Sequence, residues 1–432
     1  MRQPTNNPSS RGANLTLAML CFVYVLNFLD RQLISILAKP IQDGLNVSDG
    51  QLGMITGFYF ACFYCVIAIP IGWLADRTNR VRVLSVACAL WSAATAACGL
   101  ANNYGQLVVA RMMVGVGEAG GVPPSYAIIS DSFPRERRTT AMAIFNLGPP
   151  IGSALGVAFG ASLAAAFDWR TPFYVIGAIG VVAAIAVYFL VDEPARGQQD
   201  GFAEAAYRSA EPIGLGAAIL QFFRNPLLLM ASLASSAGNF ITYGLLNFTT
   251  LFLMREKGMT LGDVAIWYAL VIGIGMGGGI YASGRIVDRF AARSKAAYAA
   301  VPAASLVLAL PFFLGFVWAP GWQLALVFLF VPMFLNSFFL SATVTFVQGE
   351  VPPERRVISG ALLLLVMNFI GLGLGPTYVG MASDYFRPTH GVHALQAAYY
   401  ALAPVYLIGA ALFLILARLI RRNERRHPGA SA

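Results

Sequence analysis

The chain has 432 residues, of which 58% are hydrophobic and 11% are charged, and its formal net charge is +9. Soluble domains usually contain about 25% charged residues, so this composition excludes an ordinary soluble protein and indicates a helical protein that crosses a membrane many times. The basic residues lie in short loops between apolar stretches. They are typical of topology signals and argue against a nucleic-acid partner.

Twelve apolar stretches are long enough to cross a hydrocarbon core of about 30 Å, which takes about 20 helical residues. The first six are predicted at 14–38, 51–74, 83–101, 106–129, 139–167 and 171–191. The second six are predicted at 226–254, 262–284, 296–317, 321–348, 357–383 and 395–418. The fold class is therefore all-α, with two six-helix bundles.

The predicted domains follow from these stretches. They are an N-terminal tail at 1–13, a first bundle at 14–191, a linker at 192–225, a second bundle at 226–418 and a basic tail at 419–432. The linker is polar and is predicted to hold a short amphipathic helix around Phe202 to Tyr207.

Basic residues divide unevenly between the loops on the two sides of the membrane. With the N-terminus inside, most of the 29 Lys and Arg residues fall on the cytoplasmic side. Those on the opposite side are Lys39, Arg170, Arg255, Lys257 and Arg387. Cytoplasmic loops carry an excess of Lys and Arg, so we expect both termini in the cytoplasm and the chain in a cell membrane, the inner membrane of a bacterium.

The two halves repeat each other. Gly72-Trp-Leu-Ala-Asp76-Arg77 after the second span is echoed by Gly284-Arg-Ile-Val-Asp288-Arg289 after the eighth. A second basic loop, Pro134 to Arg138, is echoed by Pro352 to Arg356. Parallel halves of this kind are typical of carriers that rock about a central site.

Four ionisable residues lie inside predicted spans of the first half: Asp30, Arg31, Arg111 and Glu118. Arg111 and Glu118 are two helical turns apart and share a face. The four charges sum to zero, which makes a paired cluster tolerable inside a membrane. Protonation of one carboxylate leaves a net positive charge that attracts an anion. We predict that Glu118 carries the proton and Asp30 orients the arginines, while Arg31 and Arg111, with Asn27, bind substrate; a static structural network is the alternative.

The loop Gly72-x-Leu74-x-Asp76-Arg77-x-x-Arg80 resembles the signature of the major facilitator superfamily, except that Asn79 stands where glycine is usual. The resemblance extends over all the predicted spans. It implies a cytoplasmic latch between the halves that forms in one state of a carrier, although helix capping is the simpler interpretation. The residues of this latch are Gly72, Asp76, Arg77, Arg80, Arg137, Asp288 and Arg289.

More narrowly, the chain resembles the Spinster family of lipid transporters. The matching stretches are Asn27-Phe-Leu-Asp30-Arg31, Arg111 to Ala119, Ser130 to Arg138, Asp192 to Gly197 and Asn368 to Pro376. The resemblance implies a lysophospholipid or a sphingoid-type lipid as substrate. Gly117-Glu118-Ala119-Gly120 and Phe145-Asn146-x-Gly148 also resemble carriers of the anion:cation symporter family, so a small organic anion stays an alternative substrate.

The second half has no Asp, Glu, Lys or Arg well inside its predicted spans. Phe334 and Phe338 are spaced to share a helix face, and we predict that they contact the apolar part of an amphiphile, with packing against lipid or neighbouring helices as the alternative. Glycines and prolines in the fifth and eleventh spans predict helix irregularities that act as hinges or as packing sites. These residues are Gly148, Pro149, Gly152, Gly371, Gly375 and Pro376.

These features together predict a secondary active transporter, coupled to protons, that moves an amphiphilic anion by alternating access. We expect no catalytic residue, metal or cofactor other than protons; His390 and His393 lack a third ligand, and the five cysteines lie in apolar stretches. Partners are membrane lipids and the substrate, and we expect a monomer. A membrane enzyme that uses Asp30 and Glu118 as acid and base, and a channel or receptor, are the rival classes.

Overall fold

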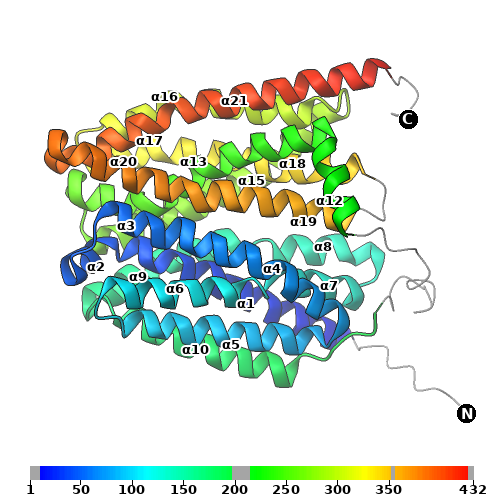
Figure 1. The fold of residues 1–432 in the computed structure, drawn as a ribbon, viewed down its shortest axis with the longest axis horizontal. Coiled ribbons are helices and arrows are strands. Elements are labelled where there is room, and N and C mark those ends of the chain that lie inside the picture. Colours follow the sequence, from blue (N-terminus) through cyan, green and yellow to red (C-terminus); the bar gives the residue numbers. More distant parts are fainter. Residues whose placement is uncertain (1–9, 197–214, 352–355, 427–432) are drawn as a thin grey trace, which may run out of the picture. The chain divides into compact units, whose positions relative to one another are not determined.

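The structure of the chain is a computed structural model that describes residues 10–196, 215–351 and 356–426. These residues form helices, among them three π-helical segments and one 3-10 turn, and they contain no strand (Figure 1). The amphipathic helix predicted around Phe202 to Tyr207 lies outside them. The all-helical prediction is confirmed for the described part of the chain.

The chain forms two compact units. The described part of the first comprises residues 10–33, 63–156 and 167–196. Its helices are α1 (Ser10–Ile36), α4 (Phe60–Arg77), α5 (Arg80–Gly99), α6 (Tyr104–Glu118), α7 (Val122–Ser132), α8 (Arg135–Phe145), α9 (Gly148–Ala166) and α10 (Thr171–Leu190). Helices α1, α4 and α9 each continue past a boundary of this unit, so their remaining residues belong to the second unit.

The second unit comprises residues 34–62, 157–166 and, from 215 onward, the rest of the described chain. Its first helices are α2 (Ala38–Leu45), α3 (Asp49–Met54) and the π-helix η1 (Ile55–Tyr59). The middle of the unit is α12 (Leu215–Arg224), α13 (Pro226–Lys257), α14 (Leu261–Asp263), the π-helix η2 (Val264–Tyr268), α15 (Ala269–Ala291), α16 (Ala297–Trp318), α17 (Trp322–Leu335) and α18 (Phe338–Gly349). It ends with α19 (Arg356–Met367), the π-helix η4 (Asn368–Leu374), α20 (Gly375–His390), the 3-10 turn η5 (Gly391–His393) and α21 (Ala394–Arg426).

Nine helical stretches of the described chain are long and apolar enough to cross a membrane. One of them, residues 358–425, covers two predicted spans. The predicted spans 106–129 and 226–254 are helical but are not among the nine; a turn at residues 119–121 divides the first of them. The predicted bundle boundaries stay predictions, and the compact units differ from them because residues 34–62 and 157–166 group with the second half.

Local sequence explains where several helices begin. The Asn79 side chain accepts a hydrogen bond from the backbone N–H of Arg82 and caps α5. Asparagine is among the best residues at this position because its oxygen satisfies an otherwise unpaired N–H. Asn79 therefore has a structural reason to replace the glycine of the superfamily motif. Ser48 and Gln51 form a capping box at the start of α3.

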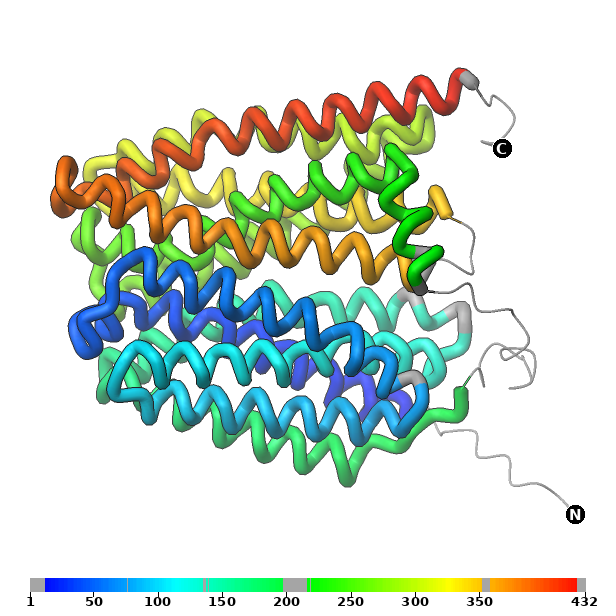
Figure 2. The backbone as a smooth tube through the Cα atoms, viewed as in Figure 1, coloured from blue at the N-terminus to red at the C-terminus, as the bar shows by residue number. Residues whose placement is uncertain are grey.

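Small residues let the helices of each unit approach closely. In the first unit, α5 and α10 run side by side (Figure 2), and a Cβ on Gly177 would lie 2.7 Å from the carbonyl oxygen of Ser92. Contacts of this kind replace the hydrophobic effect as the main packing force between helices in lipid. In the second unit, α16 and α21 are adjacent, and the rings of Phe313 and Tyr406 stack with centroids 5.0 Å apart.

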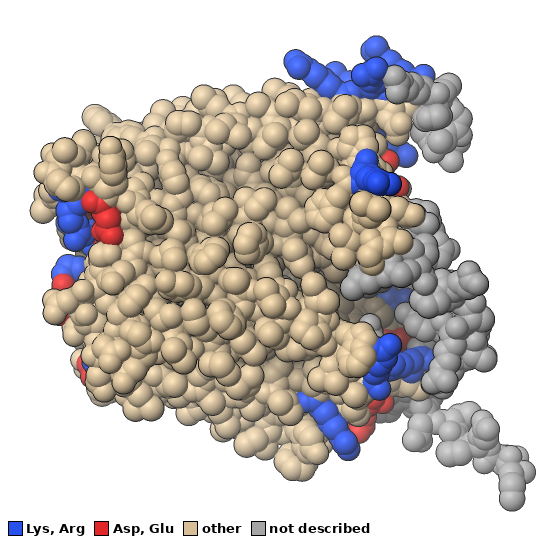
Figure 3. Space-filling model, viewed as in Figure 1, with Lys and Arg blue, Asp and Glu red and all other residues tan. Residues whose placement is uncertain are grey.

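Large apolar side chains cover the outer faces of the helices. Phe189 is 76% exposed, and Trp73, Phe167 and Tyr385 are also exposed. On the face drawn in Figure 3, the charged residues lie at the ends of helices and the surface between them carries no charge. An apolar surface of this extent is typical of a protein that lies in lipid.

Candidate functional site

The first unit brings together the four ionisable residues that the sequence singles out. Arg31 on α1 donates from Nε to Glu118 Oε2 on α6 over 2.6 Å. Arg111 NH1 on α6 lies 3.7 Å from Asp30 Oδ1 on α1. Two helices thus exchange two ion pairs, and each helix supplies one acid and one base.

All four side chains are enclosed, but to different degrees. The side chains of Asp30 and Arg111 are each 2% exposed, and the Glu118 side chain is fully buried. The Arg31 side chain is 9% exposed. Taking charges out of water costs several kcal/mol per ion, so the cluster depends on the cancellation of its charges. Arg31 is the member of the cluster that a ligand reaches most easily.

The carboxylates of this cluster are incompletely hydrogen-bonded. Asp30 Oδ1 and Glu118 Oε1 are buried and have no hydrogen-bond partner among the described residues. A buried acceptor without a donor costs about 1–3 kcal/mol, and more when it is charged. Each carboxylate therefore has one oxygen at which a proton would displace no hydrogen-bond donor.

Three residues that sequence analysis did not select complete the cluster. The Thr95 hydroxyl on α5 donates to Asp30 Oδ2, and it also lies 2.9 Å from the backbone oxygen of Trp91. The ring of Tyr64 on α4 faces the Arg31 guanidinium at 5.2 Å, and the ring of Phe28 faces it at 4.8 Å. These aromatic faces favour a cation and hold Arg31 in position. Asn27, predicted as a substrate ligand, is buried beside Glu118.

The residues of the predicted latch lie apart from this cluster. Arg80 is held within the first unit, where it pairs with Asp131 at 2.5 Å and with Glu193 at 2.7 Å. The Arg77 guanidinium stacks on Trp73 at 4.0 Å. A Cβ on Gly72 would meet no atom of the described chain within 4 Å.

The other latch residues are exposed: Arg137 on α8, and Asp288 and Arg289 on α15 of the second unit. The position of the Asp76 side chain is not among those described. The role of these residues as a latch stays a prediction.

Phe334 and Phe338 belong to the second unit, where their ring centroids are 5.6 Å apart. Phe338 is 4% exposed, and its helix, α18, packs against α15. A Cβ on Gly279 of α15 would lie 2.1 Å from the Phe334 backbone oxygen. The predicted contact of these rings with a substrate stays a prediction.

The predicted helix irregularities are present at both places. Residues 146 and 147 form a turn between α8 and α9, and Asn368–Leu374 is π-helical. A Cβ on Gly148 would lie 2.7 Å from the Tyr24 ring, and one on Gly152 would lie 2.4 Å from the Val25 oxygen. These glycines are packing sites, whereas their role as hinges, with Pro149, stays a prediction.

The eleventh-span glycines are equally crowded. A Cβ on Gly371 would lie 2.5 Å from Cβ of Asn239, and one on Gly375 would lie 2.4 Å from the Phe240 oxygen. Pro376 lies in the first turn of α20, where its missing N–H costs no helical hydrogen bond. In the described ranges, no group of three or more His, Cys, Asp or Glu residues is placed to hold a metal ion.

Known proteins resemble this chain over nearly its whole length. The family model of the Major Facilitator Superfamily matches residues 20–376. An MFS-type efflux pump of Mycolicibacterium smegmatis is 31% identical, over 96% of this chain and 94% of that protein. Protein spinster homolog 1 of Rattus norvegicus is 29% identical, over 96% of this chain and 83% of that protein.

A solved structure shows the same fold. It is that of a bacterial homologue of the human lysosomal transporter Spinster in an inward-facing and unoccupied conformation. It superposes with a TM-score of 0.87 at 27% identity and covers 96% of this chain and 98% of that one. The helical units, the buried charge cluster and these similarities lead to one conclusion: the chain belongs to the major facilitator superfamily of membrane transporters and is similar to its Spinster members.

Proposed function

We propose that this protein is a proton-coupled secondary transporter that moves an amphiphilic anion, such as a lysophospholipid or a sphingoid-type lipid, by alternating access. The observation that carries the proposal is the charge-balanced cluster of Asp30, Arg31, Arg111 and Glu118, whose two carboxylates each keep one buried oxygen without a donor. Twelve spans with both termini in the cytoplasm, in a bacterial inner membrane, complete the proposal.

The Arg31–Glu118 pair couples the proton to the substrate. With Glu118 charged, its Oε2 accepts from Arg31 Nε at 2.6 Å and the cluster is neutral. A proton on Glu118 weakens this ion pair and leaves the cluster with a net charge of +1, so Arg31 becomes available to an anionic headgroup. When the headgroup leaves, Arg31 returns to Glu118 and favours release of the proton. Proton and anion therefore bind together, which is the condition for symport.

The two arginines have different tasks in this scheme. Arg31, with the more exposed side chain and two aromatic faces around it, contacts the headgroup. Arg111 is 2% exposed and faces Asp30, so it balances the inner charge. Sequence analysis predicts both arginines as substrate ligands. The lower exposure of Arg111 is the physical reason to give the two arginines different roles.

The substrate class rests on two supports. The relatives named spinster and the solved Spinster homologue are similar to this chain over 96% of its length. The cluster itself requires an anion, because a single proton makes it positive. The efflux pump of M. smegmatis is also a relative, so export of an amphiphile is the alternative direction. A small organic anion satisfies the cluster equally well and is the alternative substrate.

The test is flux into proteoliposomes. Lysophospholipids, sphingoid phosphates and small organic acids are each supplied with and without a pH gradient, to wild type, Glu118→Gln and Glu256→Gln. Glu256 is also a buried carboxylate but lies on α13 of the second unit, so it is the matched control. We expect Glu118→Gln to abolish gradient-driven flux and to retain substrate binding, with Glu256→Gln close to wild type. Full coupled flux in Glu118→Gln would refute the assignment.

A further inference from the structure

Thr95 is the side chain that responds to the charge of Asp30. Its hydroxyl has one hydrogen and two acceptors in reach, Asp30 Oδ2 and the Trp91 backbone oxygen. When Asp30 is charged, the hydroxyl donates to it. When Asp30 carries a proton on Oδ2, the carboxyl becomes the donor, and the hydroxyl turns to the Trp91 oxygen. Each state of Asp30 thus has a complete hydrogen bond on this side.

We propose that Thr95 is a positioning residue that sets the proton affinity of Asp30, an inference that rests on the proton coupling proposed above and extends it from Glu118 to Asp30. The other groups around Asp30 are Arg31 on α1, Cys98 on α5, and Arg111 and Glu118 on α6. The ion pair between Arg111 and Asp30 is to the other oxygen, Oδ1, at 3.7 Å. Thr95 is therefore the neutral donor on Oδ2, and it stabilises the charged carboxylate more than the protonated one.

The pH profile of transport tests this role. Thr95→Val keeps the shape and removes the hydroxyl, so we expect half-maximal uptake to move to higher pH by about 0.5–1 unit. Thr95→Ser keeps the hydroxyl and restores the wild-type profile. In an Asp30→Asn background, Thr95→Val produces no further shift.

Two failures are distinguishable. A wild-type uptake that does not depend on pH refutes the proton coupling itself. A pH-dependent wild type with an unshifted Thr95→Val profile, or a Thr95→Ser shift as large as that of Thr95→Val, refutes the role of Thr95 alone.

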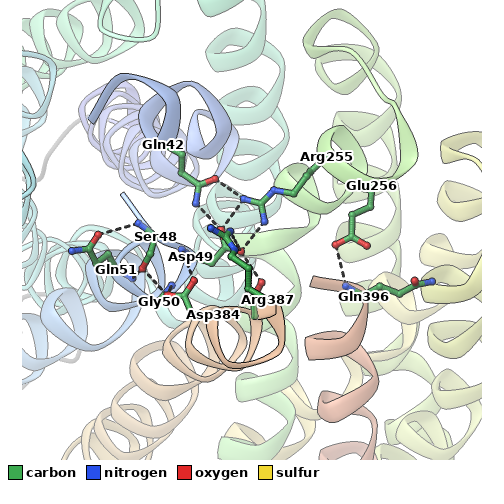
Figure 4. A network of polar contacts seen from close by, with 11 residues as sticks. Gln42, Ser48, Asp49, Gly50, Gln51, Arg255, Glu256, Asp384, Arg387 and Gln396 are labelled. Carbon is green, nitrogen blue, oxygen red and sulfur yellow. Dashed lines mark hydrogen bonds and ion pairs between the residues drawn. The ribbon is translucent and has the colours of Figure 1, made fainter. Parts of the chain in front are cut away.

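A second inference comes from a network in the second unit (Figure 4). The Asp49 carboxylate at the start of α3 is fully buried, and Arg255 of α13 donates to both of its oxygens, at 2.7 and 2.8 Å. Arg387 of α20 donates at 3.1 Å. Ser383 and Gln42 each donate at 2.6 Å. One carboxylate thus joins α2, α3, α13 and α20.

A second carboxylate strengthens the same contact. Asp384 of α20 accepts from the Ser48 hydroxyl at 2.6 Å and from the backbone N–H groups of Asp49 and Gly50 at 3.2 and 2.8 Å. These N–H groups belong to the first turn of α3, where no helical partner exists. Asp384 therefore accepts hydrogen bonds from the start of α3, although the two lie more than 300 residues apart in the sequence.

The backbones beneath this network touch without side chains between them. A Cβ on Gly380 would lie 2.3 Å from the Asp49 oxygen, and one on Gly53 would lie 2.5 Å from the Pro376 oxygen. Further along, a Cβ on Gly57 of η1 would lie 2.4 Å from the Gly373 oxygen of η4. Two π-helical segments meet at this point, and such segments are frequent at functional sites.

The hollow beside the network is lined by three cations. It has a volume of about 440 Å³ and is bordered by Lys39, Arg255 and Arg387. Lys39 pairs with Asp43, and both arginines pair with Asp49. Because each cation already has a carboxylate, the hollow needs no added anion. It lets water reach Arg387, whose side chain is 48% exposed.

The geometry points to a latch that is released during transport. The Asp49 latch, meaning Asp49, Arg255, Arg387 and Asp384 with their hydrogen bonds, fastens residues 34–62 to α13 and α20. These residues continue α1 and α4, whose other parts belong to the first unit. In the alternating access proposed above, the site opens at this end only when residues 34–62 separate from α13 and α20. In the structure described, the latch holds residues 34–62 against α13 and α20.

Spin-label distances test the latch. Labels are attached to Gly44→Cys on α2 and Tyr385→Cys on α20, both exposed positions of the second unit, in a chain without its native cysteines. We expect one dominant short distance in this parent chain. Asp49→Asn should increase the long-distance fraction at least tenfold. Asp43→Asn is the matched control, because it removes a carboxylate that is 62% exposed and outside the latch.

Arg387→Gln is the second variant, since it removes one partly exposed donor and is the less disruptive change to the fold. It should raise the open fraction to a smaller extent than Asp49→Asn. Unchanged distances in both variants would overturn the latch, as would an equal effect of Asp43→Asn. Absence of transport in wild-type vesicles refutes the proposed function instead, so the two failures are separable.

Discussion

Two buried clusters of charge in this protein differ in how fully their carboxylates are hydrogen-bonded. In the first unit, Asp30 and Glu118 each have an oxygen without a donor. In the second unit, Asp49 accepts from Arg255, Arg387, Ser383 and Gln42. Both clusters carry acids and arginines from distant parts of the chain, so charge alone does not distinguish them.

The difference separates two tasks. A carboxylate with an oxygen that no donor reaches can accept a proton there without losing a hydrogen bond, which fits the change of charge proposed for the first cluster. A carboxylate surrounded by donors keeps its charge, and it can lose its partners only when helices move. This difference in hydrogen bonding underlies the two proposals, proton coupling at the first cluster and a released contact at the second.

The test with the largest expected effect removes one arginine from each cluster. Arg111→Gln should lower the free energy of unfolding by about 3–5 kcal/mol, because a buried charge loses its partner. Arg255→Gln should cost about 1–3 kcal/mol, because three donors to Asp49 remain. Thermal and denaturant unfolding in detergent measures both. Equal losses would contradict the difference in hydrogen bonding.

The next test adds a methyl group at each of two glycines. Gly380→Ala places a Cβ 2.3 Å from the Asp49 backbone oxygen, whereas a Cβ on Gly72 meets no described atom within 4 Å. Overpacking of this kind costs about 1–3 kcal/mol. We expect Gly380→Ala to favour the long distance between labels on residues 44 and 385, and Gly72→Ala to leave that distance unchanged. A similar shift in both variants would show that the close contact is not specific to the latch.

A third test keeps the charge and changes its shape. Arg31→Lys loses the planar group that stacks between Phe28 and Tyr64 and donates through Nε to Glu118. We expect the concentration for half-maximal uptake to rise about tenfold, which corresponds to about 1.4 kcal/mol. Arg387→Lys, a matched change at the other cluster, should leave this concentration unchanged in steady-state uptake. An unchanged concentration for half-maximal uptake in Arg31→Lys would show that Arg31 does not contact the headgroup.

The smallest effect concerns Glu256, which lies beside the Asp49 latch (Figure 4). Burial raises the pKa of Glu256, although its carboxylate accepts from the Gln396 N–H at 3.1 Å and lies 3.5 Å from His393. The native state therefore holds a proton at pH values where the unfolded chain has released it. Its contribution to stability is greatest at low pH and falls as the pH rises through the raised pKa.

We expect Glu256→Gln to gain stability relative to wild type as the pH rises from the ordinary pKa of a glutamate through the raised pKa of Glu256, by less than about 1 kcal/mol. Unfolding in detergent at a series of pH values measures this gain. A gain at low pH instead would mean that His393 and the Gln396 N–H outweigh burial.

The sequence predicted the helical class, the family and the cluster of Asp30, Arg31, Arg111 and Glu118. Ionisable residues in long apolar runs are conspicuous, because membrane burial makes them costly. The sequence did not predict the role of Thr95 beside Asp30. Threonines that donate to the carbonyl four residues back are common in helices, and they do not indicate a charged neighbour.

The Asp49 latch was also invisible in the sequence. Asp49, Arg255 and Arg387 lie at the ends of predicted spans, where charged residues usually face water or headgroups, and the two arginines are separated from Asp49 by 206 and 338 residues. Only the fold brings them together. The same contact explains why residues 34–62 group with the second half, which a division at the linker does not predict.

The many hydrogen bonds to Asp49 in the latch limit the rate of the transport cycle. A carrier must break such a contact once in every cycle, and each 1.4 kcal/mol added to the barrier slows turnover about tenfold. A buried ion pair suits a contact that must break in each cycle, because the cost of desolvation nearly cancels the attraction between the charges. The contact is therefore specific, but its net free energy is small. Replacing the pair by a tightly packed apolar contact would leave the chain folded and slow the carrier. The hollow that admits water to Arg387 also lowers this barrier, because water can hydrate the guanidinium as it leaves Asp49.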